Sequence, residues 1–468
     1  MNIKFLQNPI QTILILILCS VFCVFVILNR TLIIDDAYIT FQYARNFAEH
    51  LKPWYNLDPF YQGNGQTSLL WMWVLSAFNW VGLKSEKIFY IVNILIGIFL
   101  IIQAVSLIFK EQKPLKKMFR VIFSLFFTYW MALNSTHGLE TILSTFVLYM
   151  FLKDWKNIRN PYSLLLVLVR PEFGIFLVFW FLNSNFSQKK EVITKFLYSS
   201  AGILIFALFY FIFYKFYIPL PFILKSNFNS YSYLGFKVFL GRFILFSPVI
   251  LALLYKKNYF KLIPLVFLIF FYSFNISSYS SGIYIRYFFP LTTYFLIADF
   301  DFSSHNFYRK ATNLVVSCVL LASALRMIDL SKNFHDDRQG VITDNEGFYS
   351  SYGVLAKKLK KSDRVIIMDA GHVAYFSPAT VYDGYGLNDA TMLLARKHSD
   401  TATYRNYVDT RKINIVSVVS KDSLTFNPRI DSGFTYKSLN LQHKKLLYKL
   451  PMHSNFYLFV STYKAHCD

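Results

Sequence analysis

Apolar residues dominate the chain from Ile10 to Leu325, in runs of about 15 to 25 residues separated by short polar stretches. A helix needs about 20 such residues to cross the hydrocarbon core of a bilayer. The pattern therefore predicts a polytopic α-helical membrane protein with about eleven transmembrane helices. From about residue 330 onward the chain is polar and mixed in charge, and it contains no run long enough to span a bilayer.

Two short aliphatic runs in this last part, at 364–368 and 413–419, are each bounded by polar and turn residues. Such runs predict strands of an α/β fold. We therefore predict a transmembrane domain at 1–329, with its first extracytoplasmic loop at 31–87, and an extracytoplasmic α/β domain at 330–468.

Clusters of Lys and Arg indicate which loops face the cytoplasm. They lie at 110–120, 153–156, 189–190, 256–257 and 309–310. If the short Trp-rich run at 67–83 crossed the membrane, the first of these clusters would lie outside. We therefore expect that run to lie in the outer interface. The first apolar run lacks a small-residue cleavage site, which indicates a retained signal-anchor. With the N-terminus taken as cytoplasmic, about eleven spans place the C-terminal domain on the outer side.

Composition agrees with a membrane protein, because 55% of the residues are hydrophobic and only 16% are charged. The net charge of +22 would also suit nucleic-acid binding. However, the cations lie in short loops beside apolar runs, where anionic lipid attracts them. We predict no nucleic-acid partner. The four cysteines form neither a CxxC pair nor a disulfide framework.

Ionisable residues gather where this topology places the outer face. Asp35 and Asp36 lie a few residues after the first apolar run, which ends at about Leu28, and a carboxylate there can take a proton from an attacking hydroxyl. Cations on the same side can hold a phosphate and stabilise the charge that grows on it as it leaves. The candidates for substrate binding are Arg45, Thr67, Ser68, His137, Glu140, Arg170, Glu172, Lys225, Arg286 and Tyr287.

The apolar run at 162–181 carries Arg170, Pro171 and Glu172 at its middle. Charges at the bilayer centre are costly, and proline interrupts a helix. We expect two short half-depth helices with these residues at an outer apex, beside a water-filled cavity in the outer leaflet.

Structural explanations remain open for the same residues. Asp35 and Asp36 could cap the helix that follows them. Arg170 and Glu172 could be a buried ion pair, and Lys225 could be an interfacial side chain with its ammonium at the surface.

The motifs, taken in order, resemble the GT-C type polyprenyl-phosphate-dependent glycosyltransferases, in particular the branch of the mycobacterial terminal arabinofuranosyltransferase. The resemblance covers about residues 30 to 395, although the segment before Lys225 is about two residues shorter than in the family. The matching elements are DDAYITFQYARN at 35–46, GQTSLLW at 65–71, GLET at 138–141, RPE at 170–172, PLP at 219–221, RYFFPL at 286–291, DAGHVAYF at 369–376 and YDGYGLND at 382–389.

The resemblance implies an inverting transferase on the extracytoplasmic face of a bacterial inner membrane. Asp35 would be the base and Asp36 a helper or acceptor-positioning group, although which of the two is the base stays open. Lys225 and Arg286 would hold the donor phosphate. The partners would be membrane lipid, a polyprenyl-phosphate sugar (arabinofuranose or another pentose or hexose) and an acceptor glycan, lipopolysaccharide or glycoprotein.

Glu140, Arg170 and Glu172 would line the cavity in such an enzyme. No cofactor is implied beyond the lipid-linked sugar, which is a co-substrate. The pattern does not call for a metal, although dependence on a divalent ion stays open. His137 fits a structural role better than a metal ligand, because no second His stands at ligand spacing.

In the C-terminal domain, polar residues at strand ends and turns fit a structural or acceptor-docking role: Asp369, Gly371, Asp383, Asn388 and Asp389. A lipid flippase or transporter is the main rival for the whole chain. It would show internal repeats and ionisable residues along a path through the midplane, whereas here no repeat is found and the ionisable residues cluster on one side. A non-catalytic glycan- or lipid-binding membrane protein is the second rival.

Overall fold

The structure is a computed structural model of the 468-residue chain. It describes residues 8–30, 32–58, 64–214, 219–221, 233–275, 285–298, 315–330, 351–369, 371–421, 430–441, 446–451 and 457–463. Contacts divide the chain into two compact units. The first, here the helical unit, is Met1–Thr31, Phe89–Phe206 and Asn227–Arg338. The second, here the mixed unit, is Leu32–Ile88, Ala207–Ser226 and Gln339–Asp468.

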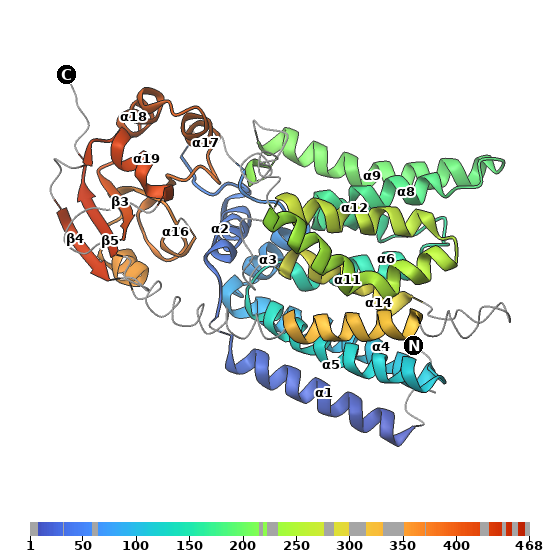
Figure 1. Cartoon of the computed structure of the whole chain (residues 1–468). Coiled ribbons are helices and arrows are strands. Elements are labelled where there is room, and N and C mark those ends of the chain that lie inside the picture. Colours follow the sequence, from blue (N-terminus) through green and yellow to red (C-terminus); the bar gives the residue numbers. More distant parts are fainter. Residues whose placement is uncertain are drawn as a thin grey trace. The chain divides into compact units, whose positions relative to one another are not determined.

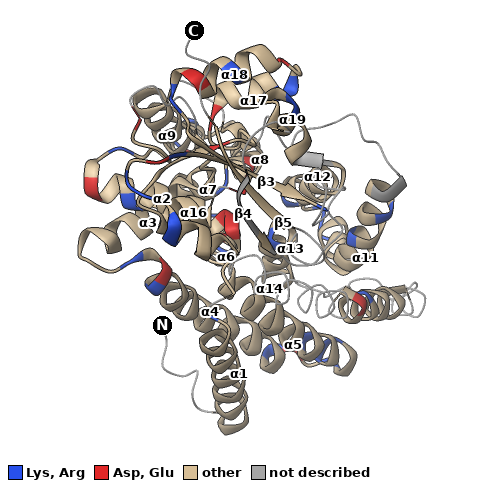
Figure 2. Ribbon diagram, turned by 90° about the vertical axis from the view of Figure 1, so that its left-hand side faces the viewer, with Lys and Arg blue, Asp and Glu red and all other residues tan. Residues whose placement is uncertain are grey.

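The helical unit is built mainly from apolar helices (Figure 1). Its core is aromatic, with Phe123 stacked on Phe295 at 4.9 Å between ring centroids and Phe127 on Phe289 at 5.4 Å. Charged residues are sparse along α1 and sit toward one end of α5 (Figure 2). The elements are α1 (Pro9–Leu28), α5 (Pro114–Thr136), α6 (Thr141–Lys153), α7 (Ser163–Val169), η2 (Pro171–Phe173), α8 (Gly174–Leu182), α11 (Tyr233–Tyr255), α12 (Tyr259–Asn275), α13 (Ile285–Phe288), η4 (Phe289–Thr292), α14 (Thr293–Ile297) and most of α4 (Ser85–Lys110) and α9 (Lys189–Phe213).

Four helices in the described ranges are long and apolar enough to cross a bilayer. They are Pro9–Leu28, Ser85–Lys110, Lys189–Phe213 and Gly235–Tyr255. Their outward faces carry exposed apolar side chains, such as Leu16 of α1, which is 61% exposed, as lipid-facing side chains are. The chain is therefore of the helical membrane type. The predicted number of about eleven spans is not reproduced, because several of the apolar runs fold into helices of only 10–17 residues.

The predicted break in the run at 162–181 is confirmed. Helix α7 ends at Val169, Arg170 is extended (φ −152°, ψ 114°), and a 3-10 turn over Pro171–Phe173 leads into α8. Proline lacks the N–H that a continuing helix needs, so the helix ends before Pro171.

In the mixed unit, a five-stranded sheet has the order β2-β1-β3-β5-β4. β1 (Arg364–Ile367) lies parallel to both β2 (Thr380–Asp383) and β3 (Ile415–Ser420), whereas β5 (Tyr457–Thr462) is antiparallel to β3 and β4 (Leu446–Pro451). All six residues of the central strand β3 are buried. Both predicted strands are confirmed, to within one or two residues. The accompanying helices are α16 (His372–Phe376), α17 (Ala390–Lys397), α18 (Thr401–Thr410) and α19 (Ile430–Ser438).

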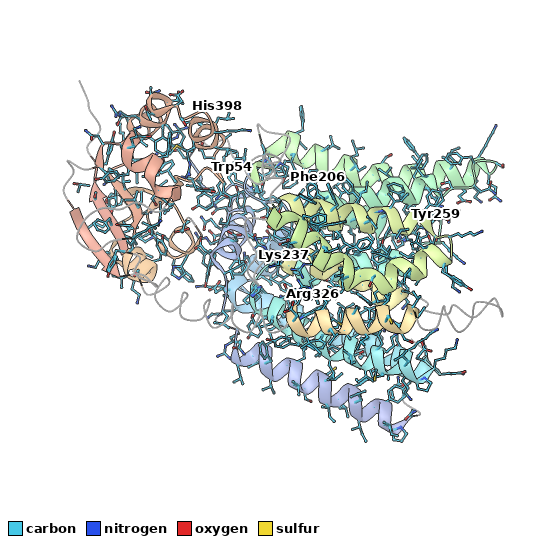
Figure 3. All side chains as sticks on the ribbon, in the orientation of Figure 1. Trp54, Phe206, Lys237, Tyr259, Arg326 and His398 are labelled. Carbon is cyan, nitrogen blue, oxygen red and sulfur yellow. The ribbon has the colours of Figure 1, made fainter. Side chains whose placement is uncertain are left out.

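The first loop belongs to the same unit as this sheet. Helix α2 (Asp35–His50) packs against α3 (Leu69–Trp80) and α16. The 12 residues of α3 span about 18 Å, which is less than the ~30 Å hydrocarbon core and agrees with a helix that does not cross. Trp54, labelled in Figure 3, donates its indole N–H to the carbonyl of Phe213 at 2.9 Å. The domain boundary predicted at 329/330 stays a prediction.

Candidate active site

Asp35 is the first residue of α2, after the buried pair Ile33 and Ile34. Its side chain turns to the C-terminal part of the chain rather than to its own helix. One carboxylate oxygen accepts the backbone N–H of Gly371 at 2.9 Å, and the other accepts that of His372 at 2.8 Å. Two amides, at the point where α16 begins, thus hold the carboxylate in one orientation.

Gly371 is required by space at this contact. A Cβ atom on it would lie 2.0 Å from the main-chain oxygen of Asp35 and 2.8 Å from its carboxylate carbon. The backbone of Gly371 has ordinary angles (φ −81°, ψ −70°), so close approach, rather than conformational freedom, excludes a side chain.

The environment of Asp35 changes its acidity. Burial raises the pKa of Asp35 to about 7, the charge of Asp369 adds to this rise, and the two amide hydrogen bonds oppose it. The carboxylate of Asp369 itself accepts a hydrogen bond from the Tyr352 hydroxyl, at 2.8 Å between the two oxygens. A carboxyl group that titrates near neutral pH is suited to act as a general base.

Aromatic rings of α2 and α16 pack against one another beside this contact. The Tyr38 ring lies edge-on to His372 at 5.1 Å and to Phe376 at 5.4 Å. Burial lowers the pKa of His372 to about 4, so its imidazole is neutral at pH 7. Arg45, one of the predicted binding residues, donates to the carbonyl of Tyr375 at 2.9 Å and lies over the ring of the same residue.

Asp36 occupies the same first turn of α2 and is partly buried. The two acidic side chains near a helix N-terminus favour the helix electrostatically, as the structural explanation expects. The carboxylate of Asp35, however, binds the amides of Gly371 and His372. A residue that only capped α2 would bind amides of α2 itself.

The Gly-Gln-Thr-Ser segment is tied down by buried hydrogen bonds. Ser68 caps α3 by accepting the Trp71 N–H at 3.4 Å, and it is 1% exposed. Gln66 accepts the Thr40 hydroxyl at 3.0 Å. A buried capping serine holds a helix start, whereas the neighbouring Thr67 is only partly buried.

The segment at 382–389 is organised by Asp383, which accepts the backbone N–H groups of Tyr385, Gly386 and Asn388 at 2.8–3.1 Å. The Tyr43 hydroxyl joins this segment to the first loop by contacting Asn388 at 3.3 Å and the N–H of Gly65 at 2.7 Å. These contacts favour the structural role expected for this group of residues.

In the helical unit, a second group of predicted residues comes together. Arg170, 3% exposed, bonds Glu140 at 2.8 Å and Glu172 at 3.3 Å. The Tyr272 hydroxyl donates to Glu172 at 2.8 Å. The Arg170 guanidinium also lies 5.1 Å from the centre of the Tyr287 ring.

Arg286 donates to the Tyr287 hydroxyl at 3.0 Å, so it joins the Arg170 group through that ring. His137 follows the end of α5 and is partly buried. Lys225 lies outside the described residues. The two ion pairs that Arg170 makes, with Glu140 and Glu172, favour the ion-pair explanation for this residue.

The predicted residues thus fall into two groups: Asp35, Asp36, Arg45, Thr67 and Ser68 in the mixed unit, and His137, Glu140, Arg170, Glu172, Arg286 and Tyr287 in the helical unit. Sequence reasoning did not single out Glu86, which accepts the hydroxyl of Tyr375. Nor did it find Asp58, which pairs with Arg364 at 2.6 Å. An isolated acidic residue gives no local signal of such a partner.

No group of three or more His, Cys, Asp or Glu that could hold a metal ion occurs in the described ranges of the chain. Independence from metal stays a prediction.

Comparison with known proteins adds one finding. A family model described as a domain of unknown function (DUF8728) matches residues 344–463, which span the sheet of the mixed unit. No curated protein matches the chain.

Proposed function

We propose that this protein is an integral-membrane inverting glycosyltransferase of the GT-C type. It moves a sugar from a polyprenyl-phosphate donor to a hydroxyl of a cell-surface glycan, lipopolysaccharide or glycoprotein. The proposal places the protein in a bacterial inner membrane, with the active site and the C-terminal part on the extracytoplasmic side. The observation that carries it is Asp35, a carboxylate oriented by two amides and titrating at a pKa of about 7, shortly after a helix long enough to span.

In the proposed reaction, Asp35 takes the proton of the acceptor hydroxyl. The hydroxyl oxygen forms a bond to the anomeric carbon as the bond from that carbon to the donor phosphate breaks, and polyprenyl phosphate leaves with the electron pair. A single displacement inverts the anomeric centre. A carboxylate has about four lone-pair sites, so each Asp35 oxygen can hold its amide and still accept a further hydrogen.

Cations in this proposal stabilise the departing phosphate. Lys225 and Arg286 remain the proposed donor-binding residues. Arg170 is better suited to positioning, because two carboxylates already neutralise it. A salt-bridged guanidinium that orients Glu140 and Glu172 keeps the wall of a cavity in shape without binding the phosphate itself.

The test uses the purified full chain in nanodiscs with a radiolabelled polyprenyl-phosphate sugar. Asp35→Asn is expected to reduce transfer by about 10²-fold or more, because general-base catalysis contributes about 10²–10⁴-fold. Release of polyprenyl phosphate separates an enzyme from a flippase or a binding protein, since only an enzyme produces it. Undiminished transfer by the variant would show that Asp35 is not the base.

The pH profile supplies a second readout. The base must be ionised, so kcat/KM of the unmodified protein is expected to rise with pH and to level off above about 7. Residual activity of Asp35→Asn should lack that rise. Asp154→Asn, in a loop of the helical unit, is the matched control and should behave as the unmodified protein. A rise that persists in Asp35→Asn would assign the titration to another group.

A further inference from the structure

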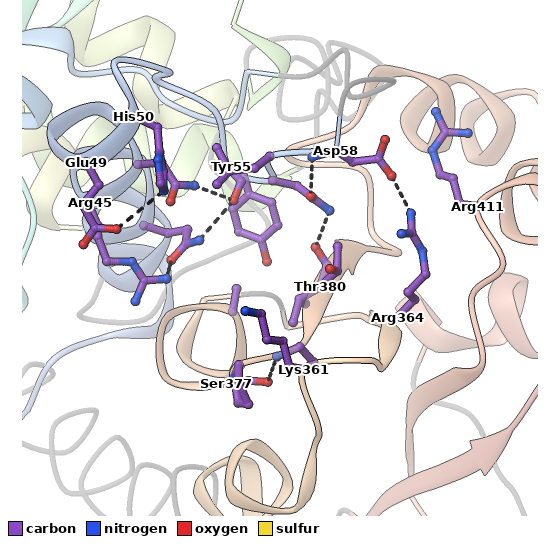
Figure 4. Close-up of a pocket in the computed structure, with 18 of the residues that line it drawn as sticks. Arg45, Glu49, His50, Tyr55, Asp58, Lys361, Arg364, Ser377, Thr380 and Arg411 are labelled. Atoms are coloured by element: carbon purple, nitrogen blue, oxygen red, sulfur yellow. Dashed lines mark hydrogen bonds and ion pairs between the residues drawn. The ribbon is translucent and has the colours of Figure 1, made fainter.

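An open cleft of about 870 Å³ lies entirely within the mixed unit (Figure 4). Helix α2 supplies one wall with side chains from successive turns, among them Gln42, Arg45 and Glu49. The opposite wall comes from the C-terminal sheet region and includes Arg364, Thr380 and Lys412. The cleft is therefore built jointly by the first loop and the C-terminal part of the chain.

Cations outnumber carboxylates in this lining. Five Lys or Arg residues line it, against the two carboxylates of Glu49 and Asp58: Arg45, Lys361, Arg364, Arg411 and Lys412. Arg364 is paired with Asp58 at 2.6 Å. The Arg411 guanidinium lies 3.7 Å from the centre of the Tyr407 ring, which holds it in place.

The remaining cations are not neutralised by acids. Arg45 donates to two neutral oxygens, the Tyr375 carbonyl at 2.9 Å and the Gln42 amide at 2.5 Å. Lys361 and Lys412 are exposed, and Lys361 extends toward the middle of the cleft (Figure 4). Within the part of the chain that the structure describes, none of these three forms an ion pair with a carboxylate. The cleft therefore carries positive charge that a ligand can neutralise.

The cleft also lies close to Asp35. Gln42 and Arg45 follow Asp35 on α2 by seven and ten positions, or about 10 and 15 Å along the helix. Ala374, on the opposite wall, belongs to the short helix α16, whose first amides hold the Asp35 carboxylate. The cleft and the surroundings of Asp35 are therefore built on the same two helices, α2 and α16.

We propose that this cleft binds the acceptor, and that the acceptor is an oligosaccharide carrying phosphate or carboxylate groups. This inference rests on the proposed function. The cations hold the anionic groups by charge-assisted hydrogen bonds, and the chain of sugars leads one hydroxyl to Asp35.

The lining favours an anionic glycan over a lipid surface or a nucleic acid. Glu49 and Asp58 lie among the cations, together with Asn46, Asn56, Ser377 and Thr380. Carboxylate and amide oxygens accept hydrogen bonds from sugar hydroxyls, whereas they repel a continuous row of phosphates. A concave site of this size suits a ligand with volume rather than a flat layer of headgroups.

The test measures binding without any donor. The full chain, in nanodiscs of zwitterionic lipid, is titrated with fluorescent oligogalacturonate, a phosphorylated oligosaccharide, and a neutral oligogalactose of matched length. Both anionic probes are expected to bind more tightly than the neutral one, by at least tenfold at low ionic strength, and to weaken with added salt.

Lys361→Gln/Lys412→Gln is expected to weaken binding of the anionic probes about tenfold, which corresponds to about 1.4 kcal/mol. The control Lys397→Gln/Lys437→Gln removes the same charge from exposed positions outside the cleft and should leave binding unchanged. Equal affinity for charged and neutral probes would overturn the proposal, as would equal losses in the two double variants.

Vesicles containing anionic lipid provide the remaining arm. If these vesicles displaced the anionic probes, and if their own binding required Lys361 and Lys412, the cleft would be a lipid site and the proposal would be wrong. Because no donor is present, loss of transfer in Asp35→Asn and loss of binding in the lysine variant are independent. Failure of one proposal is therefore distinguishable from failure of the other.

Discussion

The carboxylate of Asp35 accepts a hydrogen bond from Gly371, which lies 336 positions away in the chain. Its neighbour Asp36 has the same charge and follows the same apolar run. The amides of Gly371 and His372, however, both donate to the carboxylate of Asp35. A residue oriented in this way needs little reorganisation when it accepts a proton. At the residue scale, these amides are what distinguishes the surroundings of Asp35, the proposed base.

The first prediction concerns Gly371. Gly371→Ala places a methyl group 2.0 Å from the Asp35 carbonyl oxygen, which neither backbone can accommodate without shifting. We expect it to destabilise the mixed unit by about 1–3 kcal/mol, as overpacking does, and to reduce transfer because the carboxylate moves. Thermal unfolding and the radiolabel assay measure the two effects.

Gly353→Ala is the matched control in the same unit. A Cβ on Gly353 would meet its nearest neighbour, an atom of His372, at 3.9 Å, and residue 353 lies in a helix. Alanine should therefore be neutral or should stabilise by about 0.5–1 kcal/mol. If both variants behaved alike, the close approach of Gly371 to Asp35 would not be important in solution.

At the scale of elements, the interruption between α7 and α8 gives Arg170 its environment. Pro171 stops the helix, and Arg170 then bonds Glu140 at the start of α6 and Glu172 in the following turn. A continuous apolar helix would leave these charges without such partners. The break in the helix therefore goes together with the ion pairs of Arg170.

The second prediction follows from this network. Arg170→Met leaves two carboxylates, each only 13% exposed, near each other without their cation. It should destabilise the helical unit by about 3–5 kcal/mol. Arg159→Met, at an exposed loop position, should have little effect on thermal unfolding in detergent.

The triple variant Glu140→Gln/Arg170→Met/Glu172→Gln should recover much of that stability, because it removes the uncompensated charge as well. No difference between Arg170→Met and Arg159→Met would mean that the ion pairs contribute nothing to stability.

At the scale of the whole molecule, the proposed residues divide between two units. The helical unit contains the ion pairs of Arg170, and the mixed unit contains Asp35 and the cationic cleft. The first loop folds together with the C-terminal sheet, although more than 250 positions separate Ile88 from Gln339. The proposed base and the proposed acceptor cleft consequently belong to one compact body.

The third prediction tests which side of the membrane this body occupies. After replacement of Cys19, Cys23, Cys318 and Cys467, Lys397→Cys at the end of α17 should react with an impermeant maleimide in intact cells. Arg159→Cys, beside the basic segment 153–156, should react only after the inner membrane is permeabilised, because positive loops face the cytoplasm. Labelling in the reverse order would place the proposed active site inside.

Several features could be predicted because neighbouring residues determine them. The strands near 364–368 and 413–419 follow from short aliphatic runs, and the break at Arg170 follows from a proline between two charges. The number of spans could not be predicted in this way. Apolar residues occur both where a helix is buried in protein and where it faces lipid. A short helix such as α6, most of whose residues are buried in protein, is therefore as apolar as a membrane-spanning helix.

By itself, the sequence determined the membrane character, the strand positions and the set of candidate polar residues, since periodicity and composition act locally. Only the tertiary structure decided that Asp35 meets Gly371, that Arg170 pairs with Glu140, and that Arg45 and Lys361 line one cleft. The physical reason is that hydrogen bonds, ion pairs and pKa shifts depend on distances of a few ångströms. Packing sets those distances between segments that no local pattern relates.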